Sequence, residues 1–363
     1  MPRKGPVLAA FLALGLFWGS WAAVLPSVQR GAHVSKGTLG LALLFVTLAA
    51  IPTMLFVAGP LVERFGVRAM TIGCFAFAAA TTLPGLADSL PALILALAVT
   101  GAATGALDVA MNAAAGRIES VSGRRLMPLA HGLYSVGVLI GAVSAGLARN
   151  SGVHREDILL GVSVALVVVG FWTATDSGPV SPPEARGLRI AHALILIGLV
   201  GAAAFVVEGG IESWSALFLE RQLHADPAIS GLGPGFFGGS MATGRFFAQA
   251  TRVSDRTLLV GGGLVATIGC AVAALAPDPA VALAGFAVGG LGVSLNAPIV
   301  FGAGGRHSAA GTATVTTLGY AGLLVGPPLV GGVAQASSLR ISFVVLACVA
   351  AATAAVAARL RLR

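Results

Sequence analysis

The hydrophobic positions of this chain lie in long, nearly unbroken runs that are separated by short polar stretches. Most runs contain about 20 residues, the length that an α-helix needs to cross ~30 Å of hydrocarbon. Irregular sheet is excluded at that depth, because each unpaired backbone amide would cost several kcal/mol. The pattern therefore predicts an all-α polytopic membrane protein with twelve transmembrane helices, at residues 6–29, 38–62, 69–88, 91–117, 127–149, 157–175, 190–219, 229–250, 257–276, 279–303, 309–336 and 339–358.

The composition agrees with a protein whose solvent is the lipid bilayer. Of 363 residues, 56% are hydrophobic and 10% are charged, against about a quarter charged in soluble domains. The net charge of +8 comes from residues in short loops, so we expect no nucleic-acid partner. The three cysteines lie in apolar runs without metal-ligand spacing, and we expect neither a metal nor a cofactor.

The basic residues predict the orientation of the chain. If the N-terminus is inside, sixteen of the 22 Lys and Arg residues, Arg245 among them, fall on the cytoplasmic side. Six, including Arg149 and Arg155, fall outside. This positive-inside bias favours an even number of spans with both termini cytoplasmic. The first apolar run is too long for a signal peptide, so we expect a multi-pass protein of the bacterial cytoplasmic (inner) membrane.

One connector has the composition of a linker between domains. Residues 176–189 (DSGPVSPPEARGLR) are rich in proline and polar residues, and six predicted spans lie on each side. A shift of 185 residues also aligns Gly137 with Gly322 and Gly141 with Gly326. We therefore expect two pseudo-symmetric six-helix bundles, at residues 1–175 and 190–363, which is a transporter architecture.

The loop between the second and third predicted spans carries a recognisable motif. Residues 59–68 read GPLVERFGVR and resemble the G-x-L-x-D-R-x-G-x-R loop of the major facilitator superfamily, with a glutamate in place of the usual aspartate. The resemblance implies the fold of that superfamily and a gating loop. In such a loop, glycines allow close helix approach and charged residues form a cytoplasmic latch. The residues of the motif are Gly59, Glu63, Arg64, Gly66 and Arg68.

The second half keeps only part of this motif. Gly244, Arg245 and Phe246 are present, but the acid–arginine pair is displaced to residues 255 and 256, so a second latch is doubtful. Four further stretches are similar to the YbjJ-type bacterial inner-membrane proteins: residues 108–112, 131–137, 208–214 and 319–328. That branch is similar to sugar–proton symporters, which implies solute transport but no particular substrate. The fifth span lacks the proline of the drug–proton antiporter signature, which disfavours an antiporter.

Three of the fourteen acidic residues lie well within predicted spans, where lipid disfavours charge. They are Asp108, Glu208 and Glu212, and each would cost about 2.5–3.5 kcal/mol at the centre of the bilayer. Asp108 shares a helix face with Asn112, and Glu208 shares one with Glu212. A water-filled cavity next to these faces is the least costly explanation. We therefore predict that the three carboxyl groups take part in proton coupling. The alternatives are a structural role for Asp108 and Glu208, bonded to neighbouring backbone, and a position near the interface for Glu212.

The resemblance implies that the first, fourth, seventh and tenth spans line a central cavity. The amides of asparagine can bond solute hydroxyl groups, and a tryptophan can stack on a sugar face. Structural alternatives stay open: helix–helix contacts for the asparagines, interfacial positions for the tryptophans, and packing for the histidine. The candidate cavity residues are Trp21, Asn112, His131, Tyr134, Trp214, Asn296 and Tyr320.

These features predict proton-coupled alternating access for a small polar, sugar-like solute, by a monomer. Protonation of Glu208 or Asp108 would remove the cost of a buried charge when the cavity closes, so that the loaded carrier can reorient. Moving one proton across ~100 mV supplies about 2.3 kcal/mol. The alternatives are proton-driven efflux of an amphipathic compound, a non-transporting membrane sensor, or a membrane enzyme. An enzyme is disfavoured, since only two of the six histidines, His131 and His192, lie in predicted spans, and neither has a metal-spaced partner. The chain also has no P-loop, which disfavours direct ATP drive.

Overall fold

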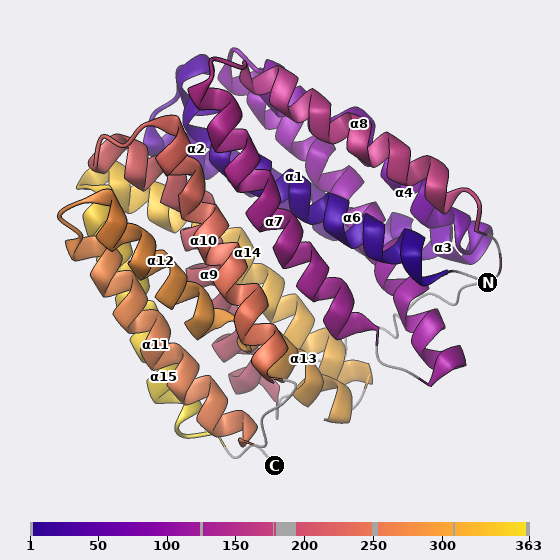
Figure 1. The fold of residues 1–363 in the computed structure, drawn as a ribbon. Coiled ribbons are helices and arrows are strands. Elements are labelled where there is room, and N and C mark those ends of the chain that lie inside the picture. Colours follow the sequence, from indigo (N-terminus) through magenta and orange to yellow (C-terminus); the bar gives the residue numbers. More distant parts are fainter. Residues whose placement is uncertain are drawn as a thin grey trace. The chain divides into compact units, whose positions relative to one another are not determined.

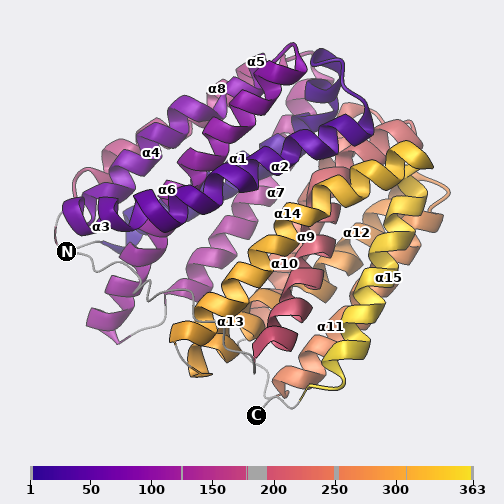
Figure 2. The same ribbon diagram turned by 180° about the vertical axis from the view of Figure 1, so that it is seen from behind.

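The computed structural model describes residues 3–123, 126–176, 178, 194–248, 253–307 and 309–360, and its regular elements there are all helical. The prediction of an all-α fold is confirmed. Figures 1 and 2 show the helices from opposite sides. Their bounds are α1 Lys4–Gly31, α2 Lys36–Pro52, the π-helix η1 Thr53–Ala58, α3 Gly59–Phe65, α4 Arg68–Thr81, α5 Leu83–Leu86, α6 Leu90–Ser122, α7 Met127–Asn150, α8 Arg155–Thr173, α9 Ile195–Gln222, α10 Pro227–Ala248, α11 Asp255–Leu275, α12 Pro279–Val293, α13 Asn296–His307, α14 Ala309–Ala336 and α15 Leu339–Ala357.

The chain divides into two compact units. The first consists of Met1–Val34 and Ala42–Glu184, and the second of Ser35–Leu41 and Ala185–Arg363. The first unit thus holds α1 to α8 apart from the beginning of α2, and the second holds α9 to α15. Residues 177 and 179–189 of the predicted linker lie outside the described residues.

Eleven helical segments of the described chain are long and apolar enough to cross a membrane. Each corresponds to one of the predicted spans, although residues 190–193 at the start of the seventh lie outside the described part. The eighth predicted span, 229–250, is the 22-residue helix α10, which is not among the eleven. Six glycines in α10 lower its hydropathy without preventing the helix. Its last two predicted residues, 249 and 250, lie outside the described residues.

Three of the spans are interrupted close to a proline. In the second span, η1 separates α2 from α3, with Pro52 before it and Pro60 after it. In the third span, α4 ends at Thr81 and α5 begins at Leu83, next to Pro84. In the tenth span, α12 ends at Val293 and α13 begins at Asn296, two residues before Pro298. A proline has no N–H for the carbonyl four residues earlier and its ring clashes with that carbonyl, so the helix kinks there.

Glycines allow a close helix crossing in the first unit. In α7, a Cβ at Gly137 would clash with the carbonyl oxygen of Leu12, and one at Gly141 would clash with that of Leu16. The helix α1 therefore lies directly against the backbone of α7. Small residues four positions apart are a common means of bringing two membrane helices together.

The second unit repeats this crossing between α9 and α14. A Cβ at Gly322 would clash with the carbonyl oxygen of Ala202, and one at Gly326 would lie 3.3 Å from that of Val206. These are the glycines that the 185-residue shift aligns with Gly137 and Gly141. Each unit therefore contains one helix pair in which two glycines face two carbonyl groups that are four residues apart.

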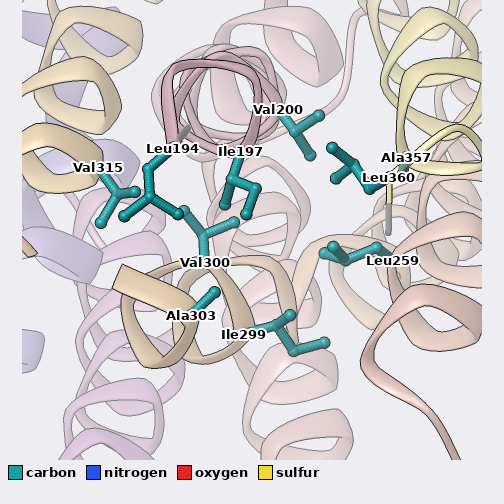
Figure 3. Packing of buried hydrophobic residues seen from close by; sticks show 10 residues of the cluster. All are labelled: Leu194, Ile197, Val200, Leu259, Ile299, Val300, Ala303, Val315, Ala357 and Leu360. Carbon is teal, nitrogen blue, oxygen red and sulfur yellow. The ribbon is translucent and has the colours of Figure 1, made fainter. Parts of the chain in front are cut away.

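An apolar cluster in the second unit holds α13 against α9 (Figure 3). Its members come from α9, α11, α13, α14 and α15 or lie just beside them, and all are at most 8% exposed. The part of the tenth span that follows the interruption is thus fixed by packing. The cluster consists of Leu194, Ile197, Val200, Leu259, Ile299, Val300, Ala303, Val315, Ala357 and Leu360.

Candidate functional site

The second unit contains an ion pair between two of its membrane-spanning helices. The Nη2 atom of Arg245, on α10, lies 3.6 Å from the Oε1 atom of Glu208, on α9. The two side chains are only 13% and 15% exposed, respectively. In such surroundings each charge would be costly alone, so the pairing explains how both are accommodated.

Arg245 also reaches the interrupted tenth span. Its Nε atom donates to the carbonyl oxygen of Ser294 at 3.4 Å. In an uninterrupted helix, that carbonyl would accept from the N–H of residue 298, but residue 298 is a proline and has none. The guanidinium therefore supplies a donor that the helix itself lacks, and it links α9, α10 and the end of α12.

A glycine allows α10 to approach this point. A Cβ at Gly244 would clash with the hydroxyl oxygen of Ser294. The hydroxyl of Ser294 in turn donates to the carbonyl of Leu291 at 2.7 Å, which fixes its orientation within the last turn of α12. The adjacent residues Gly244 and Arg245 thus have complementary roles, one providing space and the other a donor.

The other predicted polar residues of the second unit lie on three different helices. Glu212 is one turn beyond Glu208 on α9, close enough to interact electrostatically with both Glu208 and Arg245. Asn296 is the first residue of α13 and is 4% exposed. Tyr320, on α14, is half-buried. The interruption thus places Asn296 at the start of a new helix, two residues after the carbonyl that Arg245 binds.

The first unit holds its buried acid differently. Asp108 and Asn112 are half-buried on α6, one turn apart. The side-chain amide of Asn112 donates to the Oδ1 atom of Asp108 at 3.1 Å and to its backbone carbonyl at 2.8 Å. The predicted pairing on one helix face is therefore present, and the partner of the carboxyl group is a neutral amide.

Both predicted tryptophans lie in the packed interior of their units. Trp21 is 3% exposed, and Trp214 is fully buried against α14, near Gly331. The indole Nε1 of Trp214 has no hydrogen-bond partner within the described part of the chain. Both rings are therefore buried in this structure.

His131 and Tyr134 lie near the beginning of α7 in the first unit. His131 is exposed, and its ring meets that of Phe11 edge to face, with centroids 5.2 Å apart. Tyr134 is half-buried, and its backbone carbonyl packs where a Cβ at Gly15 would clash. Both residues therefore contact α1, and the tyrosine does so at the glycine crossing described above.

The predicted gating loop forms a tight turn between α3 and α4. Gly66 has a φ of +57°, which a residue with a side chain rarely adopts. The charged residues Glu63, Arg64 and Arg68 are all exposed. Within the described residues none of these three forms an ion pair, and the guanidinium of Arg64 instead lies 5.4 Å from the centre of the Phe65 ring.

The same loop is attached to the beginning of the predicted linker. The backbone N–H of Val67 donates to the carbonyl of Gly178 at 3.0 Å. The nearby carboxylate of Asp176 is 1% exposed and binds Arg3 through its Nε atom at 2.6 Å and its backbone N–H at 2.8 Å. Two short segments distant in sequence, residues 3 and 67, therefore hold the chain as it leaves α8.

The sequence analysis did not place Arg245 in the site; it counted the residue as a cytoplasmic charge and as part of the incomplete second loop motif. In the structure its side chain lies inside the second unit and pairs with Glu208. Arg149, counted as an outer loop charge, is likewise buried, and it donates to the carbonyl of Ala23 at 2.7 Å. Two features of the sequence could have pointed to this contact: Arg245 lies in a glycine-rich predicted span, and Pro298 lies in another. Nothing in the sequence indicates that the two residues are close in space.

Comparison with known proteins gives a consistent result. The family model of the Major Facilitator Superfamily matches residues 7–322. An uncharacterised MFS-type transporter of Yersinia pestis is 31% identical, covering 97% of this chain and 93% of its own length. The uncharacterised transporter y4wD of Sinorhizobium fredii is 28% identical (98% and 97%), and the membrane protein MosC of Rhizobium meliloti is 29% identical (91% and 83%).

Solved structures share the fold. A variant of the nucleoside transporter NupG matches with a TM-score of 0.78 at 12% identity, covering 97% of this chain and 98% of that one. A bacterial homologue of the human lysosomal transporter Spinster, in an inward-facing and occupied conformation, matches with a TM-score of 0.73 at 15% identity, covering 98% and 95%. At these identities the likeness concerns the fold.

Proposed function

The chain belongs to the major facilitator superfamily, and we propose that it moves a small polar, sugar-like solute across a bacterial inner membrane by proton-coupled alternating access. It is a multi-pass secondary transporter and not an enzyme, as the sequence analysis predicted. Solute, coupling ion and direction of transport are the parts that we propose.

The observation that carries the proposal is the presence of acidic residues within the spans, each beside a specific partner. Glu208 pairs with Arg245 across two helices, and Asp108 accepts from Asn112 on its own helix. A carboxyl group at such a depth costs about 2.5–3.5 kcal/mol on insertion scales, a cost that a purely structural residue could avoid. Groups that gain and lose a proton during the transport cycle give a reason to keep them.

Proton binding would act on these two groups in different ways. An ionised Glu208 is stabilised by the guanidinium of Arg245, and protonation removes that attraction. Glu212, one turn away, adds a second acid to the same face. Asp108 can be protonated while it keeps a neutral partner, because an amide can bond either form of a carboxyl group. We therefore assign coupling to the three acids, with Glu208 as the principal group.

The polar solute is supported by the chemistry of the other predicted cavity residues. Asn112 and Asn296 carry amides and Tyr134 and Tyr320 carry hydroxyl groups, all suited to binding solute hydroxyls. The resemblance to the YbjJ-type branch, with its similarity to sugar–proton symporters, points the same way. The structural neighbour NupG is a nucleoside transporter, so nucleosides belong among the solutes to be tested.

The proposal also includes the orientation and the gating loop. The excess of basic residues on one side of the predicted spans supports cytoplasmic N- and C-termini. The loop from Gly59 to Arg68, with its tight turn at Gly66, would then lie on the cytoplasmic side and act as a latch. We propose that the functional transporter is a monomer.

The test is the external pH of weakly buffered, anaerobic cells that overexpress the protein, after pulses of sugars, polyols and nucleosides. Symport draws protons into the cell, so the substrate should make the medium more alkaline. The response should disappear in Glu208→Gln or Asp108→Asn. It should persist in Asp88→Asn, a matched change at an exposed acid between α5 and α6.

Each other result has a definite meaning. Uptake of labelled solute without a pH change would contradict proton coupling. If no solute of the panel changes the external pH while a control symporter responds, and export assays are then positive, efflux of an amphipathic compound is favoured. Binding of a solute without flux would favour the sensor.

A further inference from the structure

We propose that Arg245 is a positioning residue that makes the geometry of the interrupted tenth span depend on the charge of Glu208. The inference rests in part on the proposed function, which makes Glu208 a proton-binding group. It goes further by naming the element that responds and the contact that links the two.

The carbonyl of Ser294 depends on a donor from outside its own helix. Pro298 removes the N–H that would have bonded it, and water is scarce at the depth of a span. Arg245 is the residue that provides a donor, through Nε at 3.4 Å. Loss of that donor would leave the end of α12 with an unsatisfied backbone acceptor, so the position of Arg245 affects the stability of the interruption.

A guanidinium is well suited to hold the two acceptors together. Nε binds the carbonyl of Ser294 while Nη2 faces the carboxylate of Glu208 at 3.6 Å. Both nitrogen atoms belong to one planar, rigid group that stays charged at any accessible pH. A displacement of the guanidinium at one acceptor must therefore change its contact with the other. A lysine would provide the charge but not this fixed double contact.

The charge of Glu208 decides how strongly the guanidinium is held. While Glu208 is ionised, the attraction keeps the guanidinium between the carboxylate and Ser294. When a proton neutralises Glu208, the attraction falls, and Glu212 becomes the competing partner on α9. The helices packed against α9 bring few other titratable or charged groups. They are Tyr320 on α14, Cys348 and Arg340 on α15, and Arg306 and His307 at the end of α13. Arg340 donates to the carbonyl of Ala274, and the side chains of Arg306 and His307 lie outside the described part.

The change at Ser294 would alter the position of Asn296, which is predicted to bind the solute. The helix α13 is fixed on α9 by the apolar cluster that includes Ile299 and Val300 (Figure 3). Flexing at Ser294 and Leu295 would therefore change the angle between α12 and a firmly held α13, with Asn296 at the joint. In this way a proton on α9 would alter a solute contact on α13 without any direct bond between the two.

The test is hydrogen exchange of the backbone amides of residues 291–300 in the purified full-length protein, which needs neither solute nor transport. We expect Arg245→Gln to speed exchange in this segment about tenfold. Arg245→Lys should give a similar increase, since it keeps the charge but loses the double contact. Arg340→Gln, which also removes a donor to a backbone carbonyl, should leave the segment unchanged. In the unmodified protein, exchange corrected for its chemical rate should rise as the pH is lowered, and Glu208→Gln should abolish that dependence.

A second variant separates this inference from a general loss of stability. Pro298→Ala restores the N–H that the carbonyl of Ser294 lacks, so Arg245→Gln should have little effect in that background. Should Arg245→Gln fail to fold, Glu208→Gln/Arg245→Gln, which leaves no unpaired charge, replaces it in both backgrounds. Unchanged exchange, or equal effects with and without Pro298, would overturn the inference. If transport is proton-coupled but hydrogen exchange of residues 291–300 does not change in the Arg245 variants, the inference alone is refuted. If this exchange depends on Arg245 and on Glu208 as expected but no protons move with a solute, only the proposed function is refuted.

Discussion

The two units each place an acid inside a membrane-spanning helix, but they hold it by different means. In the first unit, Asp108 accepts from Asn112, a neutral amide on the same helix. In the second unit, Glu208 pairs with Arg245 from a different helix, and that arginine also binds the end of α12. The comparison shows that an acid in a span can be accommodated locally or through tertiary contacts. A change of charge at Asp108 disturbs one side chain, whereas a change at Glu208 concerns three helices.

The units are much more alike in how their helices cross. Gly137 and Gly141 face two carbonyls of α1, and Gly322 and Gly326 face two carbonyls of α9. The contact at Gly326 is the loosest of the four, because an added Cβ would lie 3.3 Å from the nearest atom. The repeated architecture thus tolerates a looser contact at Gly326, where an added Cβ would lie 3.3 Å from the nearest atom against 2.1–2.2 Å at the other three glycines, while the two acids have different partners.

The largest effect is expected when the ion pair is broken from one side. Arg245→Gln leaves the carboxylate of Glu208, which is only 15% exposed, without its partner. Leaving a buried charge unpaired costs about 3–5 kcal/mol in soluble proteins. Thermal unfolding in detergent, followed by tryptophan fluorescence, should therefore show a large loss of stability. The double variant with Glu208→Gln should recover most of it, and an equally unstable double variant would contradict the pairing.

A smaller effect is expected at the glycine crossings. Gly141→Ala places a methyl group against the carbonyl of Leu16, and overpacking of this kind costs about 1–3 kcal/mol. Gly326→Ala should cost clearly less, because the added methyl group nearly fits. Gly161→Ala on α8, which meets nothing within 4 Å, is the control and should change little. Equal losses at positions 141 and 326, measured by the same thermal assay, would show that the two crossings are equally tight.

The local arrangement in the first unit should be the more tolerant one. Asn112→Ala removes the hydrogen bonds to the Oδ1 atom and to the backbone carbonyl of Asp108, and we expect a loss of about 1 kcal/mol. Asp108→Asn leaves an amide in reach of an amide and should cost less than Arg245→Gln does. Unfolding temperatures of these variants, compared in one detergent, test the order. A loss at Asn112 as large as that at Arg245 would show that Asp108 has tertiary partners after all.

The smallest effect is expected at the exposed loop. Glu63 forms no ion pair among the described residues, so Glu63→Gln should change the stability by less than about 0.5 kcal/mol. Gly66→Ala, by contrast, forces a side chain into a φ of +57° and should cost more. A reversed order in the thermal assay would mean that the acid of the loop has a structural partner.

Several features of this protein could be predicted from its sequence because they depend on local properties. The length of each apolar run, the acids at 108, 208 and 212, and the face shared by Asp108 and Asn112 all follow from the period of one helix in lipid. The helical class follows for the same reason, whereas the superfamily was indicated by the resemblance of the loop at residues 59–68. The burial of Trp21 and Trp214 was not, because a ring in a span can face a cavity, the lipid or another helix, and only packing decides between them.

The sequence by itself therefore determined the membrane-spanning helices and the identity of the ionisable groups within them. The reason is that each span must by itself be long and apolar enough to cross the bilayer. Only the tertiary structure decided that Arg245 lies inside the second unit, that it pairs with Glu208, and that it serves the carbonyl which Pro298 leaves without a donor. These contacts join residues on different helices. Their energy depends on distances of a few ångströms between side chains, and no periodicity along one segment encodes such distances.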